Sequence, residues 1–260
     1  MTSPSDIGAL QAEVAPIVLA LPRLLAAFLV LPYFAGSAVS GVVRNGLVLV
    51  LAAFIAPAVP VADLPGAGPW LLIVGKESLI GLLLGLGFGV FFWALQCAGG
   101  LIDFQSGTAN AAFFDPVAGH EIGPTGDLLF RLAVTLFVSA GGLLGLVGAL
   151  FESYRLWPVT SYFPDAGAVL QAFAVREGDA ILAWIMKLAA PVVFVLVLVD
   201  LGVGLVGRAA PQLNVFVVAQ PLKGLLAILV LALVLHIVYA GLQDFLRPDN
   251  SVLQFLRHVL

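Results

Sequence analysis

The residue types that could catalyse a reaction or bind a metal are few in this chain and widely separated. Its histidines are His120, His236 and His258, and Cys97 is the only cysteine, so neither an internal disulfide nor a cysteine metal cluster can form. The stretch "HEIGP" at His120 begins like the zinc motif His-Glu-x-x-His, but Pro124 stands where the second histidine must be, which excludes a zinc protease. The chain also lacks a Gly-x-Ser-x-Gly nucleophile elbow and a Walker-type phosphate loop. We therefore expect neither a catalytic site nor a bound metal or cofactor.

Charged residues inside long apolar runs are the remaining candidates for chemistry. Among them are Lys76, Glu77, Lys187 and Asp200, and a charge in the middle of a bilayer costs at least about 2.5 to 3.5 kcal/mol unless it faces protein or water. Lys76 and Glu77 are adjacent and point about 100° apart on a helix, while Lys187 and Asp200 are about 20 Å apart along one helix. We expect that neither pair closes within its own helix and that partners come from other helices or other subunits. Alternatively, the two lysines extend to the membrane interface.

These charges must be positioned by helices that lie in a membrane. The chain is 62% hydrophobic and 10% charged, whereas an average soluble domain is about 25% charged. Crossing a ~30 Å hydrocarbon core takes about 20 helical residues, and continuous rather than alternating apolarity favours helices over a barrel. The sequence therefore predicts an all-α membrane protein with six long hydrophobic helices in hairpins, at residues 14–35, 42–62, 70–98, 128–151, 181–207 and 222–240.

The distribution of the other charges excludes some functions and leaves the membrane orientation open. Asp6 and Glu13 precede the first run without any basic residue, so we expect this run to be retained rather than cleaved as a signal peptide. The eleven Lys and Arg residues form no basic stripe, which argues against nucleic acid as a partner. The Lys and Arg residues near the ends of the runs are divided equally between the two sides of the membrane, so they predict no orientation. One side would have Arg44, Arg131, Arg208 and Lys223, and the other Arg155, Arg176, Arg247 and Arg257.

Glycines are regularly spaced in the third run. Gly81, Gly85 and Gly89 share one helical face, and small residues at this spacing let helix backbones approach closely in a membrane. Gly141 and Gly145 repeat the spacing in the fourth run. The third run is also longer than the hydrocarbon core requires, so we expect it to tilt, break or project from the bilayer.

A loop rich in Gly and Ala separates the third and fourth runs. No lysine or arginine occurs from Ile102 to Asp127, and the loop contains "QSGTANAAFFDPVAG". Glycines at its ends give conformational freedom, two phenylalanines give bulk and an apolar seal, and Asp-Pro marks a turn. This composition suits a plug that has few groups for a passing molecule to bind. A plain connector or a binding loop is the alternative. The candidate plug residues are Gln105, Ser106, Gly107, Thr108, Asn110, Phe113, Phe114, Asp115 and Pro116.

Four stretches resemble, in order, the signature stretches of the FliR/SctT family, the export-gate subunits of bacterial type III secretion. They are "GKESLIGLLLGLGFGVFFWALQCAGGLIDFQSG", "GPTGDLL", "ESYRLWPVTSYFP" and "RAAPQLNVFVVAQPLKG". Within the family, "FWAL" and "WPVTSYFP" look more like the injectisome branch than the flagellar one. One departure is Ser106 after Gln105, where many injectisome relatives carry an arginine.

The resemblance implies a subunit without catalysis, present in one copy beside FliP/SctR-type and FliQ/SctS-type membrane subunits. FlhB/SctU-type and FlhA/SctV-type export proteins and the unfolded exported polypeptide are further implied partners. The implied location is the bacterial inner membrane, with the multi-pass assembly raised toward the periplasm. The fold would resemble the first two partners fused: a FliP/SctR-like part at residues 1–180 with a pore loop at 102–127, a FliQ/SctS-like hairpin at 181–247, and a short amphipathic tail at 248–260.

The resemblance also implies roles for particular residues. In the family the loop between the third and fourth segments lies in the central pore and contributes to its plug. From the resemblance, together with the spacing and charge arguments above, we expect subunit-interface and buried-charge positions at Lys76, Glu77, Gly81, Gly85, Gly89, Asp103, Lys187, Asp200, Arg208, Pro211, Asn214 and Lys223. Two alternatives stay open at this point. A secondary transporter would use Asp200, Lys187 and His236 to line an ion or substrate path, but this class predicts a symmetry between the two halves of the chain that the sequence lacks. A scaffold would organise partner subunits without contacting the exported polypeptide.

Overall fold

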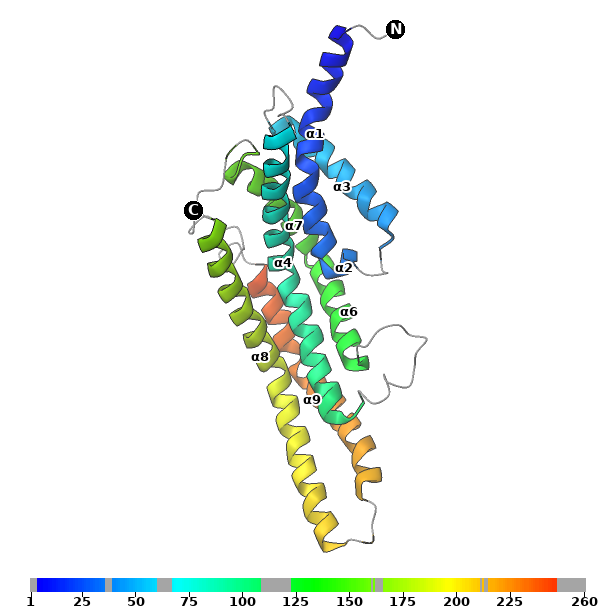
Figure 1. Cartoon of the computed structure of the whole chain (residues 1–260). Coiled ribbons are helices and arrows are strands. Elements are labelled where there is room, and N and C mark those ends of the chain that lie inside the picture. The colour runs from blue at the N-terminus through cyan, green and yellow to red at the C-terminus, as the bar shows by residue number, and fades with distance from the viewer. Residues whose placement is uncertain are drawn as a thin grey trace. The chain divides into compact units, whose positions relative to one another are not determined.

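The computed structural model describes residues 4–35, 39–59, 67–108, 123–159, 161, 166–210, 212 and 215–246. These residues form helices joined by turns, with no strand among them, which confirms the all-α prediction (Figure 1). In chain order the elements are α1 (Pro4–Val30), α2 (Pro32–Ala35), α3 (Gly41–Ile55), the 3₁₀ turn η1 (Ala56–Ala58), α4 (Ala67–Ser106), α6 (Pro124–Ser139), α7 (Gly142–Leu156), α8 (Ala166–Ala209) and α9 (Val215–Phe245).

The helices differ in length from the six predicted spans. Within the described residues, three helices, α4, α8 and α9, are long and apolar enough to cross a membrane, and α6 with α7 makes a fourth if that pair is one span. The first two runs form shorter apolar helices. The 15 residues of α3 rise only about 22 Å, which is less than the ~30 Å core. The prediction of six long helices is therefore not confirmed.

The fourth predicted run is interrupted at Gly141. This glycine has a φ of +80°, in the left-handed region, and stands directly before the first residue of α7. A side chain strains that conformation, so glycine is the residue that permits the break. A Cβ atom built on Gly141 or Gly145 would meet nothing within 4 Å among the described residues. Among the described residues the second glycine pair therefore makes no close helix contact, and a packing role for it against another subunit stays a prediction.

The third run forms a helix that is longer than predicted and does not break. Helix α4 has 40 residues, which corresponds to about 60 Å, or twice the thickness of the hydrocarbon core. Of the three options that the sequence left open, tilting and projection therefore remain.

The chain forms two compact units, each assembled from segments that are distant in sequence. Unit 1 comprises residues 1–89, 141–176 and 248–260, and unit 2 comprises residues 90–140 and 177–247. The core of unit 1 contains buried aliphatic and aromatic side chains of α1, α3 and α4, including Leu24, Phe28, Ile55 and Leu84. In unit 2, Phe91 stacks on Phe245 and meets Trp184 edge-on. The division at residue 180 into two family-like parts stays a prediction.

In unit 1 the glycine face of α4 packs directly on the backbone of α1. A Cβ atom built on Gly85 would lie 2.6 Å from the carbonyl oxygen of Ala27, and one on Gly81 would overlap the carbonyl group of Arg23. Gly89, the third glycine of the face, is also buried. The predicted close approach is therefore made to another helix of the same chain, and any contact with a second subunit stays a prediction.

The glycine contact predicts opposite effects for two alanine substitutions on α4. Gly85→Ala should lower the free energy of unfolding by about 1 to 3 kcal/mol, because the new methyl group would overlap Ala27. Gly75→Ala is the matched control: a Cβ there meets nothing within 4 Å, and alanine should stabilise the helix by up to about 1 kcal/mol. Thermal unfolding of the detergent-solubilised protein measures both. Equal stability of the two variants would contradict the close packing of α1 and α4.

Candidate functional site

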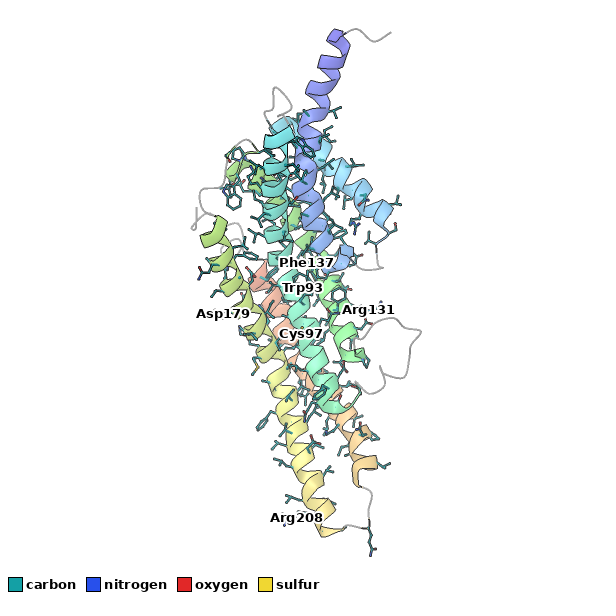
Figure 2. All side chains as sticks on the ribbon, in the orientation of Figure 1. Trp93, Cys97, Arg131, Phe137, Asp179 and Arg208 are labelled. Atoms are coloured by element: carbon teal, nitrogen blue, oxygen red, sulfur yellow. The ribbon has the colours of Figure 1, made fainter. Side chains whose placement is uncertain are left out.

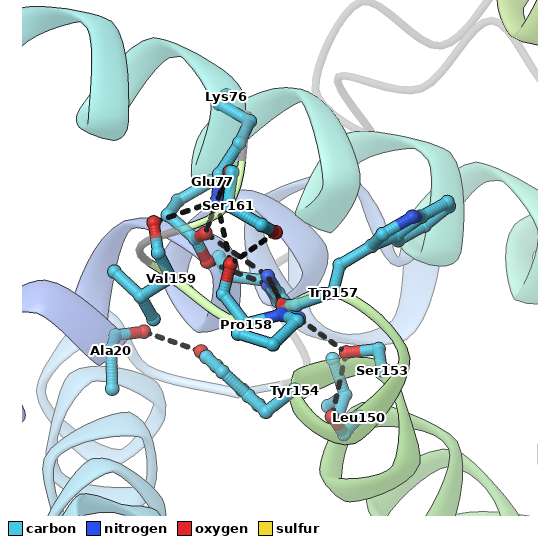
Figure 3. A network of polar contacts seen from close by, with 11 residues as sticks. Ala20, Lys76, Glu77, Leu150, Ser153, Tyr154, Trp157, Pro158, Val159 and Ser161 are labelled. Carbon is cyan, nitrogen blue, oxygen red and sulfur yellow. Dashed lines mark hydrogen bonds and ion pairs between the residues drawn. The ribbon is translucent and has the colours of Figure 1, made fainter. Parts of the chain in front are cut away.

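A buried ion pair joins α1 and α4 in unit 1. Arg23 Nε donates to Glu77 Oε2 at 2.7 Å and Arg23 Nη2 donates to Oε1 at 3.0 Å, so the guanidinium binds both carboxylate oxygens (Figure 3). Both side chains are 0% exposed. Glu77 precedes Gly81 by one helical turn on the same face of α4, so the backbone contact at Gly81 lies beside the ion pair. The pair therefore has the bidentate geometry in which a buried charge is best compensated.

The remaining donors of Arg23 are also satisfied. Its Nη1 donates to Ser153 Oγ at 3.0 Å and its Nη2 to the carbonyl oxygen of Trp157 at 2.9 Å. The guanidinium carbon lies 4.0 Å from the ring centre of Tyr154, a cation–π contact. The hydroxyl of Tyr154 donates to the carbonyl oxygen of Ala20 at 2.7 Å. Arg23 thus connects α1, α4 and the end of α7.

Lys76 holds the segment that follows α7. Its Nζ donates to the carbonyl oxygens of Pro158 at 3.0 Å, Val159 at 2.8 Å and Ser161 at 2.8 Å (Figure 3). The same Nζ lies 3.0 Å from Glu77 Oε1. The prediction that these two neighbours cannot pair was wrong, because a lysine side chain is long enough to bend toward the adjacent carboxylate. The other partners that the structure shows for Lys76 and Glu77 lie in this chain.

The sequence analysis missed Arg23, although a signal was present. Arg23 is the only charged residue in the first apolar run, residues 14–35. A lone arginine in such a run needs a buried acceptor in the same way as Glu77 needs a donor. Pairing the isolated charges of different apolar runs would have found this contact.

In unit 2 a second buried carboxylate, that of Asp103 near the end of α4, binds the start of α6. Its Oδ2 accepts from the backbone N–H groups of Thr125 and Gly126, each at 3.0 Å, and Oδ1 lies 3.2 Å from Thr125 N. Thr108 Oγ1 donates to Oδ1 at 2.8 Å. Gly123 precedes α6 and provides no side-chain cap, so Asp103 supplies the missing acceptor from another helix.

Two further contacts fix the start of the loop. Helix α4 ends at Ser106, whose buried hydroxyl donates to the carbonyl oxygen of Asp103 at 3.2 Å. Gly107 has a φ of +82°, and the side-chain amide of Gln220 from α9 lies where a Cβ on Gly107 would point. The other candidate plug residues, Asn110, Phe113, Phe114, Asp115 and Pro116, lie outside the described residues.

A third polar cluster joins α4, α8 and α9 in unit 2. Lys223 Nζ pairs with Asp200 Oδ1 at 2.5 Å and donates to the carbonyl oxygen of Gln105 at 3.1 Å. The amide of Gln105 donates to Asp200 Oδ2 at 2.9 Å. The side chain of Asp200 is 42% exposed and that of Lys223 is 13% exposed. The partner of Asp200 therefore lies on another helix, as the spacing predicted, and on the same chain.

The structure does not gather the other predicted residues at these clusters. Lys187 is exposed, with Nζ 4.8 Å from the ring centre of Trp184, and the exposed His236 has its Nδ1 3.0 Å from the carbonyl oxygen of Leu233. Arg208 is exposed in the last turn of α8 (Figure 2). Pro211 and Asn214 lie outside the described residues. Within the described ranges no three His, Cys, Asp or Glu side chains are close enough to share a metal ion.

The Arg23 ion pair predicts a large cost for removing one partner. Glu77→Ala should lower the free energy of unfolding by about 3 to 5 kcal/mol, because it leaves a buried guanidinium without its carboxylate. The double variant Arg23→Met, Glu77→Leu should lose much less. Arg131→Ala is the control, because its pair with Asp127 is surface-exposed and should contribute about 0.3 to 0.5 kcal/mol. A double variant that is no more stable than Glu77→Ala would contradict the prediction.

The Asp200 cluster predicts rescue within the chain. Asp200→Ala should destabilise the protein less than Glu77→Ala, because Asp200 is partly exposed and water replaces some of its interactions. Adding Lys223→Met should restore part of the loss, since no cation then remains without its carboxylate. Thermal unfolding of the two single variants and the double variant measures this coupling. Additive losses would show that Asp200 and Lys223 do not act as a pair.

Comparison with known proteins identifies the family. Residues 14–247 match the family described as bacterial export proteins, family 1. The chain is 39% identical to the Yop proteins translocation protein T of Yersinia pestis, over 86% of this chain and 87% of that protein. It is 34% identical to the flagellar biosynthetic protein FliR of Pectobacterium carotovorum, over 83% and 82%, and 29% identical to the surface presentation of antigens protein SpaR of Salmonella typhimurium, over 85% and 82%. The chain therefore belongs to the bacterial export proteins of family 1, the FliR/SctT family, and resembles the injectisome members more than the flagellar ones.

Proposed function

We propose that this chain is a non-enzymatic core subunit of the type III secretion export gate, where it helps to form and plug the channel for unfolded proteins in the bacterial inner membrane. The family membership and the names of the relatives, a translocation protein and a flagellar biosynthetic protein, support a role in an export apparatus. Helices α4, α8 and α9 are long and apolar enough for a multi-pass membrane protein.

The observation that carries the plug proposal is the anchoring of the loop at both ends. Thr108 and Thr125 flank it, and both bind the carboxylate of Asp103. A plug must return to one position after each passage, and a loop whose ends meet at a fixed point meets that requirement. The residues between the anchors include Phe113 and Phe114 and no lysine or arginine, so they offer apolar bulk without positive charge. We place these two phenylalanines at the constriction.

The proposed partners are FliP/SctR-type and FliQ/SctS-type subunits in one hetero-oligomer, together with FlhB/SctU-type and FlhA/SctV-type export proteins. Helix α3 supports burial against other subunits. Its large apolar side chains Val42, Val50 and Phe54 are 84%, 67% and 74% exposed, and the helix is too short to span the hydrocarbon core by itself. Such a surface marks an interaction site. An assembly raised toward the periplasm would accommodate the length of α4.

The plug proposal predicts leakage when the loop is shortened. Deleting Ala109 to Phe114 retains Thr108 and should leave the complex assembled, while cells become permeable to small ions and dyes and export is relaxed rather than abolished. Co-purification of the partner subunits, dye entry and the secretion rate measure the three effects. A control that replaces the same six residues with Gly and Ser keeps the length and should also leak if the phenylalanines form the seal. A deletion variant that assembles, stays tight and secretes at the normal rate would exclude the plug.

A further inference from the structure

Asp103 occupies a position that the plug proposal does not by itself explain. The carboxylate is 1% exposed and belongs to α4, yet its bonds reach forward to Thr108 and to the first turn of α6. We infer that Asp103 is the positioning residue of the gate. It acts as a clasp, formed by Asp103, Thr108, Thr125 and Gly126, that holds both ends of the loop and so sets its resting position. This inference rests on the proposed function of the loop.

The backbone around the clasp is shaped to bring the carboxylate against α6. A Cβ atom built on Gly123 would overlap the carboxylate of Asp103, so a side chain there would displace the clasp. A Cβ on Gly99 would lie 2.5 Å from Cα of Gly126, so α4 and the first turn of α6 touch backbone to backbone. Gly99 and Gly123 thus permit an approach that side chains would prevent.

The charge of Asp103 suits this position. The free N–H groups at a helix N-terminus carry partial positive charge, and a carboxylate that accepts from them gains both hydrogen bonds and the favourable helix dipole. The sequence from Ile102 to Asp127 contains no lysine or arginine. A neutral amide at position 103 would lose the ionic part of these bonds. Its NH₂ group would also face the backbone N–H groups of α6, from which it cannot accept a hydrogen bond.

The clasp holds the two ends of the loop unequally. The α6 end is bound through the backbone N–H groups of Thr125 and Gly126, whereas the α4 end is bound through the side-chain hydroxyl of Thr108. Releasing the first end disturbs the start of a helix, while releasing the second requires only a rotation of one side chain. The attachment at Thr108 is therefore the weaker of the two.

The test uses the full chain in its complex with the partner subunits. Asp103→Asn changes the charge with little change in shape. Thr108→Val keeps the shape of the side chain but removes its hydroxyl, and with it the bond to the Asp103 carboxylate and the contact with Ser106 Oγ. Loss of a hydrogen bond to a charged group should raise the fraction of complexes with an open channel by about tenfold or more. Dye permeability of cells should therefore rise about tenfold or more for Asp103→Asn, and in the same direction but less for Thr108→Val. Asp127→Asn is the matched control, because Asp127 is in the first turn of α6 but pairs with Arg131 on the surface, and it should not leak.

A double variant separates positioning from general destabilisation. If Asp103 acts through the loop, adding Asp103→Asn to the deletion of Ala109 to Phe114 should not raise the dye permeability further. If Asp103→Asn is merely a structural defect, the double variant should be more permeable than the deletion alone. If Asp103→Asn does not assemble, Thr108→Val decides, and an assembled, tight Thr108→Val variant overturns the clasp. A deletion that leaks while Asp103→Asn and Thr108→Val stay tight overturns the clasp and leaves the plug standing. A deletion that does not leak refutes the plug itself.

Discussion

The contact between Arg23 and Glu77 is the constraint on which the packing of unit 1 depends. A buried guanidinium is tolerated only when its donors find acceptors, and here two carboxylate oxygens, one hydroxyl and one carbonyl supply them. Because one residue along a helix rotates a side chain by about 100°, the pair fixes how α1 is turned against α4. Gly81 then meets the carbonyl of Arg23 itself. The glycine face and the ion pair are therefore two parts of one interface.

Two partly buried lysines, Lys76 and Lys223, bind backbone carbonyl groups as well as a carboxylate. Lys76 donates hydrogen bonds to three carbonyl oxygens of the segment after α7, and Lys223 donates one to the carbonyl oxygen of Gln105 near the end of α4. Carbonyls beyond a helix end lack intrahelical partners, and in an apolar environment each unpaired group is costly. A lysine can satisfy several of them because its ammonium group has three donors. Lys76 and Lys223 thus have a structural role in this chain, which is to bind carbonyl groups that no helix satisfies.

The sequence predicted the helical class and the close approach at Gly81 and Gly85, because hydrophobic length and glycine spacing are local properties. It did not predict the break at Gly141, since glycine is also common inside membrane helices and only the backbone conformation distinguishes the two uses. The candidate site was predicted in part. Asp103, Asp200 and Glu77 were identified as charges that need partners, but Arg23 and the particular partners depend on which helices meet, and that is a non-local property.

In the proposed gate, the residues that determine the position of the loop differ from the residues that would form the seal. The residues that hold the ends, Asp103, Thr108, Thr125 and Gly126, lie within or directly beside α4 and α6. Hydrogen-bonded backbone of this kind returns to one geometry after a disturbance, because its donors and acceptors have fixed positions. The proposed plug residues between the anchors therefore need no specific contacts to find their place. In the proposed plug, that separation would let the loop combine apolar bulk with few charges, a composition that offers few groups for an exported polypeptide to bind.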